Sequence, residues 1–199
     1  MLNQKAEEVL DTLLEGNRRF AGSSSVHPHQ DSARREECLK GQKPTAAIIG
    51  CADSRIPPEV IFDCGIGDIF VIRVAGTVSD KSVIASIEYA VDHLNVPLVM
   101  VLGHASCGAV TAAVKGTDAD GALKGMLESI RNDCREELAD DTLTVDDITK
   151  RYTARQAYII STEIPLVKTA INKNASSVVA AYYNLDSGLV EVLKQVFKK

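Results

Sequence analysis

The sequence predicts an α/β fold with a mainly parallel central sheet flanked by helices and an antiparallel edge strand near the C-terminus. Three apolar, β-branched segments are typical of buried parallel strands, TAAIIGCA (45–52), DIFVIRVAG (68–76) and PLVMVLGH (97–104). Helical patterns separate them, which implies a sheet covered on both faces. A later segment, SSVVAAYYNL (176–185), is followed by the turn signal DSG and then by LVEVL, which predicts a hairpin at a sheet edge.

The chain begins with a predicted amphipathic helix over residues 3–20. This charged segment carries one apolar stripe, Val9, Leu10, Leu13 and Leu14. The polar loop AGSSSVHPHQD follows, so residues 1–30 form an N-terminal helical arm and loop. Such an arm can pack on its own domain or reach across a partner subunit, and the sequence leaves both arrangements open.

Further helices are expected between and after the strands. Residues 80–94 form the clearest pattern, with an apolar stripe of Val83, Ile87, Val91 and Leu94. Residues 140–175 are also helical in pattern, with an interruption near Pro165. The chain shows no internal repeat, low-complexity tract or linker, so we expect a single domain over 1–199.

Composition excludes several classes of protein. A net charge of −5 gives no reason to expect nucleic acid or an anionic membrane surface as a partner. The longest apolar run, VPLVMVLG, is too short to span a bilayer, and the N-terminus lacks the apolar core of a signal peptide. We therefore expect a cytoplasmic protein. Its odd number of cysteines, five, argues against a disulfide framework and leaves metal binding or catalysis for some of the thiols.

Two of the predicted strands end in residues that bind metals. Cys51 stands at the carboxyl end of the first strand, and GHASCGAV after the third places His104 and Cys107 at the same edge if the strands are neighbours. One histidine and two cysteines are the ligand set of a catalytic zinc site that keeps its fourth position open. Thiolate and imidazole ligands favour Zn²⁺ over hard cations.

A carboxylate and a guanidinium follow Cys51 directly, in CADSRIPP. Asp53 can occupy the fourth position on the metal or accept a hydrogen bond from a metal-bound water, and Arg55 can hold the Asp53 carboxylate by a bidentate pair. The simpler alternatives are a surface salt bridge between Asp53 and Arg55 and a hydrogen-bonded core histidine at position 104. Because both motifs stand at predicted strand ends, the sequence favours a metal site.

These motifs occur together in a known family. The segments CADSRIPPEVIF, GDIFVIRVAGT, SIEYAVDHLNVPLVMVLGHASCGAV and YYNLDSGLVEVL closely resemble the β-class carbonic anhydrases of the plant-like and bacterial type. The resemblance implies a carbonate dehydratase, which hydrates CO₂ reversibly to bicarbonate and a proton by attack of zinc hydroxide. It implies Zn²⁺ bound by Cys51, His104 and Cys107, with Asp53 as a fourth ligand in a closed state. It also implies a catalytic pair formed by Asp53 and Arg55.

The resemblance extends to the substrate pocket. It implies that Gln30 donates a hydrogen bond to a substrate oxygen, that Phe70 and Tyr89 line the pocket, and that Gly108 allows close approach of the backbone. Part of this lining comes from the neighbouring subunit in the family, so the resemblance implies a homodimer or a higher even oligomer. Without the resemblance, Gln30 would be interpreted as a solvated loop residue and Tyr89 as an interface or core aromatic.

Other functions remain open at this point. A hydrolase of carbonyl sulfide or carbon disulfide resembles the β-class enzymes and uses the same ligands. A metal-free thiol or redox enzyme would use Cys107 with His104. A nucleotide-binding module is a weaker alternative, because GIGDIF and GHASCGAV are glycine-containing turns without a full phosphate-loop or dinucleotide fingerprint.

Overall fold

The fold is built on one five-stranded sheet, seen here in a computed structural model that describes residues 2–193. The strands are β1 (Ala46–Gly50), β2 (Ile69–Arg73), β3 (Leu98–His104), β4 (Ser177–Tyr183) and β5 (Val190–Val192). They lie in the order β2-β1-β3-β4-β5. The first four are parallel, and β5 pairs antiparallel with β4. The predicted α/β class, parallel sheet and antiparallel edge strand are confirmed.

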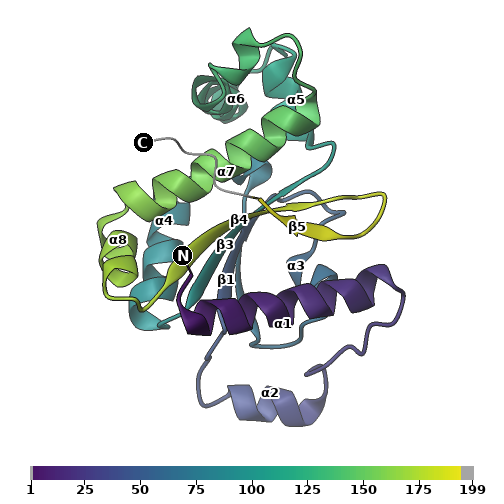
Figure 1. Ribbon diagram of the computed structural model, residues 1–199, viewed down its shortest axis with the longest axis vertical. Coiled ribbons are helices and arrows are strands. Elements are labelled where there is room, and N and C mark those ends of the chain that lie inside the picture. The colour runs from purple at the N-terminus through teal and green to yellow at the C-terminus, as the bar shows by residue number, and fades with distance from the viewer. Residues whose placement is uncertain (1, 194–199) are drawn as a thin grey trace.

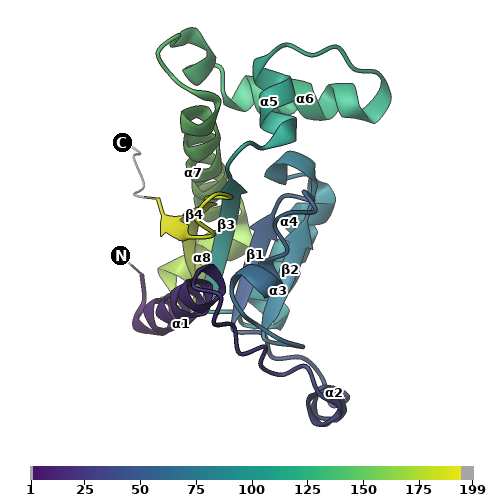
Figure 2. The same ribbon diagram turned by 90° about the vertical axis from the view of Figure 1, so that its right-hand side faces the viewer.

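Helices surround this sheet. They are α1 (Gln4–Ala21), α2 (Ser32–Cys38), α3 (Pro58–Ile61), α4 (Lys81–Glu88), α5 (Gly108–Val114), α6 (Gly121–Asp133), α7 (Val145–Glu163) and α8 (Pro165–Asn172). Three shorter helical turns are η1 (Ala75–Thr77), η2 (Tyr89–His93) and η3 (Glu137–Ala139). Figure 1 shows α4, α7 and α8 on one side of the sheet and α1 and α3 on the other. Both views place α5 and α6 beyond the end at which β3 terminates, whereas α2 lies at the opposite end (Figure 2).

The central strands are buried on both faces, which explains their continuous apolar sequences. Successive side chains of a strand point to opposite faces, so the sheet separates two apolar clusters. One cluster contains Ile48, Met100 and Leu102 with Leu10 and Leu13 of α1. The other contains Ile49, Val99 and Val101 with residues of α4, α7 and α8. Such a sheet is rigid, so its strand ends are firm supports for functional groups.

Helix α1 packs against its own chain. Asn3 caps its first turn by accepting a hydrogen bond from the Ala6 amide at 2.8 Å. The buried Asn17 amide group donates to the carbonyl oxygens of Ile61 and Gly188, and its oxygen accepts from the Val190 amide. Helix α1 therefore packs on the sheet of its own chain.

Two other segments differ from the sequence pattern in detail. The helix expected over 80–94 is α-helical to Glu88 and then continues as the π-helical turn η2, in which the Leu94 amide donates to the Tyr89 carbonyl. The expected polar loop ends in a short helix, α2, which Asp31 caps through the Arg34 amide. No residue of α2 is buried, so this helix has no apolar stripe by which a sequence pattern could reveal it.

Candidate metal centre

The ends of two neighbouring strands bring Cys51, His104 and Cys107 together. Cys51 follows β1, His104 is the last residue of β3, and Cys107 precedes α5. Strands β1 and β3 pair in parallel with Gly50 opposite Leu102, so their carboxyl ends lie side by side at the same end of the sheet. The ligand atoms of the three side chains lie within 4.8 Å of one another, and all three residues are buried. A cation within this group would contact both sulfurs and the imidazole.

The His104 ring presents a free nitrogen to this group. Its Nδ1 lies 2.9 Å from the Ala105 carbonyl oxygen, which can only accept, so Nδ1 carries the proton. In the neutral imidazole, Nε2 is then the nitrogen with a free lone pair. It is buried and has no hydrogen-bond partner. A buried polar atom without a partner is costly, and coordination to a metal would satisfy this one.

The surroundings of Cys51 favour a thiolate. The Gly76 amide donates to the Cys51 sulfur at 3.3 Å. Hydrogen bonding from the Cys107 thiol is the main cause that lowers the pKa of Cys51 to about 4, with a smaller contribution from the Gly76 amide, while burial opposes them. The pKa of Cys107 is raised, because the Cys51 thiolate lies beside it and because it is buried. A divalent cation would stabilise both thiolates at once.

Gly76, which donates this hydrogen bond, has a left-handed backbone, with φ 67°. A Cβ at this position would also lie 2.8 Å from Ile130 Cδ1 and 3.1 Å from the Ala109 side chain. Both the conformation and the close packing therefore require glycine.

Asp53 and Arg55 form a bidentate pair beside the three ligand candidates. Arg55 Nε lies 2.9 Å from one Asp53 carboxylate oxygen and Nη2 lies 2.7 Å from the other. The Arg55 amide donates to the same carboxylate at 3.0 Å, and the guanidinium also donates to the Ser106 carbonyl oxygen at 3.2 Å. The hydrogen bonds from the Arg55 side chain hold the pKa of Asp53 well below its usual range. The carboxylate therefore faces Arg55 and is not one of the three converging donors.

Arg73 also supports this loop, and sequence reasoning missed it. It is the last residue of β2, opposite Gly50 in the sheet. Its guanidinium donates to the Cys51 carbonyl oxygen at 3.0 Å and to the Asp53 carbonyl oxygen at 2.6 Å. The Arg73 side chain therefore holds two backbone carbonyl groups of the loop that carries Cys51 and Asp53. The signal in the sequence was a lone basic residue at the carboxyl end of a predicted strand.

The residues that were expected to contact the substrate do not lie close together as the three ligand candidates do. Gln30 is exposed on the loop after α1. The ring centroids of Phe70 and Tyr89 lie 6.1 Å apart, and Tyr89 is 44% exposed. Phe70 lies opposite Ala47, about 13 Å before Cys51 along the strand direction. Within one chain, the structure therefore does not bring these two aromatic residues to the three ligand candidates.

The loop that carries Gln30 is held by two carboxylates. Asp63, whose side chain is fully buried, accepts hydrogen bonds from the Val26 and His27 amides at 3.0 and 2.9 Å. Asp68 contacts His29 Nδ1 at 2.8 Å and also accepts from the Gly65 amide. The residues before Gln30 are therefore fixed to the segment between α3 and β2.

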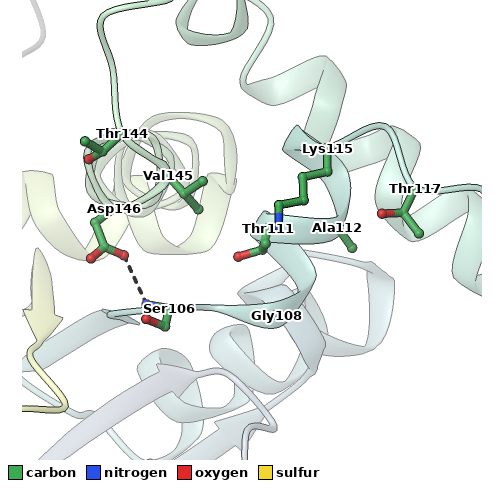
Figure 3. Close-up of a pocket in the computed structure, with 9 residues that line it drawn as sticks. All are labelled: Ser106, Gly108, Thr111, Ala112, Lys115, Thr117, Thr144, Val145 and Asp146. Carbon is green, nitrogen blue, oxygen red and sulfur yellow. Dashed lines mark hydrogen bonds between the residues drawn. The ribbon is translucent and has the colours of Figure 1, made fainter.

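Gly108 begins α5 and borders a cavity of about 700 Å³. Figure 3 shows this cavity between α5 and the first turn of α7. It is lined by Ser106, Gly108, Thr111, Ala112, Lys115, Thr117, Thr144, Val145 and Asp146. A Cβ at Gly108 would meet no atom within 4 Å, so close approach to another group of this chain does not require glycine there.

Comparison with known proteins assigns the chain to a family. The family model described as carbonic anhydrase matches residues 46–190, which include all five residues of the two motifs. The chain belongs to the β-class carbonic anhydrases. Carbonic anhydrase 2 of Mycobacterium tuberculosis is 42% identical over 192 residues, which cover 94% of this chain and 93% of the relative.

Solved structures agree with this assignment. The β-carbonic anhydrase CafA of Aspergillus fumigatus is 29% identical, with a TM-score of 0.77 over 96% of this chain and 93% of the other. A structure from a study of two tetrameric β-carbonic anhydrases of Sordaria macrospora is 26% identical, with a TM-score of 0.71 over 94% and 97% of the two chains. Zinc is the metal of this family, and two thiols with an unpartnered imidazole nitrogen are a donor set that suits it.

Over residues 2–193, no helix combines the length and the apolar character that a membrane span needs.

Proposed function

We propose that this protein catalyses the reversible hydration of CO₂ to bicarbonate and a proton at a zinc ion bound by Cys51, His104 and Cys107. The observation that carries the proposal is the convergence of these three donors within 4.8 Å, with a buried imidazole nitrogen that has no other partner. Membership of the β-class family supports the same reaction. A zinc ion with three protein ligands acidifies a bound water and so supplies a nucleophile near neutral pH.

The protein residues would orient the reacting groups. Asp53, ionised by its pair with Arg55, can accept a hydrogen bond or a proton from the nucleophile. Arg55 holds the carboxylate by two hydrogen bonds and is itself held by the Ser106 carbonyl oxygen. Arg73 keeps the Cys51–Asp53 backbone in place. Because Asp53 faces Arg55, the arrangement supports a centre whose fourth position is open to substrate.

The substrate pocket is proposed to form between subunits. Gln30 would donate a hydrogen bond to the developing bicarbonate oxygens, and Gly108 would border the pocket. Phe70 and Tyr89 contact each other, are not buried, and lie away from the ligand candidates of their own chain. We propose that they line the pocket of a neighbouring subunit, in a homodimer or a higher even oligomer. Tetrameric β-carbonic anhydrases from Sordaria macrospora support an even number of subunits.

A reducing compartment suits this site. All five cysteines are free thiols, and two of them are the proposed zinc ligands. Oxidation of either sulfur would remove a metal donor, so we propose that the protein works in the cytoplasm.

The test combines zinc content with CO₂ hydration measured by stopped flow. We expect hydration activity to be proportional to bound zinc, and both to be lost in Cys51→Ser. Cys38→Ser is the matched control, because Cys38 is a half-buried thiol outside the group of ligand candidates, and this variant should keep both zinc and activity. Full zinc content without CO₂ hydration would overturn the proposal, and hydrolysis of carbonyl sulfide or carbon disulfide would then be assayed. Activity in zinc-free protein would also overturn it.

A further inference from the structure

The backbone of Ser106 connects the proposed metal ligands with the Asp53–Arg55 pair. Ser106 lies between His104 and Cys107 and has a left-handed backbone, with φ 52°. Its carbonyl oxygen accepts a hydrogen bond from Arg55 Nη2 at 3.2 Å. A residue with a side chain rarely adopts this conformation, so surrounding contacts must hold it there.

Asp146 supplies such a contact. Its Oδ1 accepts a hydrogen bond from the Ser106 amide at 3.0 Å, and Figure 3 shows the carboxylate directed at the Ser106 backbone across one side of the cavity. The bond joins residues 40 positions apart, so it ties the loop after β3 to the first turn of α7. A charged acceptor makes a stronger hydrogen bond than a neutral one.

Capping of α7 does not explain Asp146. The N-cap residue is Thr144, and its side chain accepts from the Asp147 amide at 3.1 Å. Asp147 in turn accepts from the Thr144 amide at 3.0 Å, which completes the capping box. Asp146 is therefore not needed for the capping box, although its charge is favourable at a helix N-terminus.

Asp146 also lies beside the sheet. Tyr182 of β4 is buried and pairs with Gly103, the residue before His104. Burial and then the negative charge of Asp146 raise the pKa of the Tyr182 hydroxyl. The hydrogen bond from Ser106 joins this first turn of α7 to the loop that follows β3.

We propose that Asp146 is a positioning residue that acts through the backbone of Ser106. By holding the Ser106 amide, it restrains the peptide group before Ser106 and helps to keep Ser106 in the left-handed conformation from which its carbonyl oxygen meets the Arg55 guanidinium. The same constraint fixes the loop from which Cys107 presents its sulfur. The consequence for catalysis rests on the proposed CO₂ hydration, whereas the consequence for ligand geometry does not.

The test compares Asp146→Ala, Asp146→Asn and the control Asp147→Ala. Groups that orient metal ligands typically affect metal affinity or activity by about 10- to 100-fold, so kcat of Asp146→Ala should fall by about that factor, with KM nearly unchanged. Asp146→Asn should keep most of the activity, because the amide oxygen still accepts from Ser106. Asp147→Ala should lower the melting temperature through loss of the capping box but leave kcat unchanged.

Cobalt substitution gives a readout that does not depend on catalysis. In Co²⁺-loaded protein, the visible absorption bands report ligand geometry, and they should change in Asp146→Ala but not in Asp147→Ala. Wild-type protein that fails to hydrate CO₂ would refute the proposed function and leave this spectroscopic test intact. Wild-type spectra in Asp146→Ala would overturn the positioning role. Equal damage in the alanine and asparagine variants would overturn it too, because charge rather than the hydrogen bond would then matter.

Discussion

Gly103→Ala tests how closely β3 must approach α7 for His104 to be placed correctly. Gly103 precedes His104, and a Cβ at this position would lie 2.1 Å from Thr153 Oγ1 and 3.1 Å from Thr153 Cβ. Thr153 is fully buried on α7, and its hydroxyl is bonded to the Thr149 carbonyl oxygen. The clash therefore cannot be relieved by turning a side chain into solvent, and strand and helix must separate.

The contact with Thr153 determines how much stability Gly103→Ala is expected to lose. Inserting a methyl group into a well-packed core costs about 1–3 kcal/mol, and the 2.1 Å approach argues for the upper part of that range. For a chain of this length, about 2–4 °C of melting temperature is lost per kcal/mol. We therefore expect a decrease of about 4–12 °C in melting temperature, together with weaker zinc binding because the adjoining His104 is displaced.

A double-mutant cycle assigns the effect to this one contact. Thr153→Ala removes Oγ1 and Cγ2 and leaves the contact at 3.1 Å, so Gly103→Ala should cost at least about 1 kcal/mol less in the Thr153→Ala background. Urea unfolding of the four proteins measures this coupling. Gly125→Ala is the matched control, because a Cβ there meets no atom and alanine is the better helix former. Additive effects of the two substitutions, or a stability of Gly103→Ala equal to that of the wild type, would refute the reasoning.

Three further predictions concern pH. Arg55→Gln should lower kcat/KM by about 10- to 100-fold through misorientation of Asp53, while the pKa of that carboxyl rises toward its ordinary range. A pH–rate profile should therefore show no new acidic limb above about pH 6, and one near neutrality would contradict this role. Because the pKa of Asp53 is lower in the folded protein, its contribution to stability is present above about pH 4 and is lost at more acid pH. The difference in melting temperature between the wild type and Arg55→Gln should therefore become smaller as the pH falls below about 4. In the wild type, two thiolates donate more charge than imidazoles, so kcat/KM should rise between about pH 6.5 and 9, and a flat profile would count against the proposed ligand set.

The order of the elements and the identity of the candidate donors were accessible from local patterns. Strands β1, β3 and β4 are buried on both faces, so each appears as an uninterrupted apolar run. The rule that ligands bind at the carboxyl ends of parallel strands then directs attention to Cys51 and His104. This prediction depended on β1 and β3 being neighbours, which the sheet order bears out.

Residues that act across long separations in the chain left little local signal. Arg73 holds carbonyl oxygens that lie 22 and 20 positions earlier in the chain, and Asp146 holds an amide 40 positions earlier. In the sequence each is one charged residue among many, because nothing nearby shows which distant backbone group it meets.

The amino-acid sequence was sufficient for the fold class, the strands and the motifs, because periodicity, burial and ligand chemistry are properties of short segments. It left open where α1 packs, which way the Asp53 carboxylate faces, and what holds Ser106 in its left-handed conformation. The placement of α1 and the backbone of Ser106 depend on hydrogen bonds between groups that become neighbours when β5 pairs with β4 and when α1 and α7 pack against the sheet. The Asp53 carboxylate is fixed by Arg55, whose guanidinium is in turn held by the Ser106 carbonyl oxygen 51 positions away. Contacts between residues that are far apart in the chain form only when the whole chain folds, so no local sequence pattern predicts them.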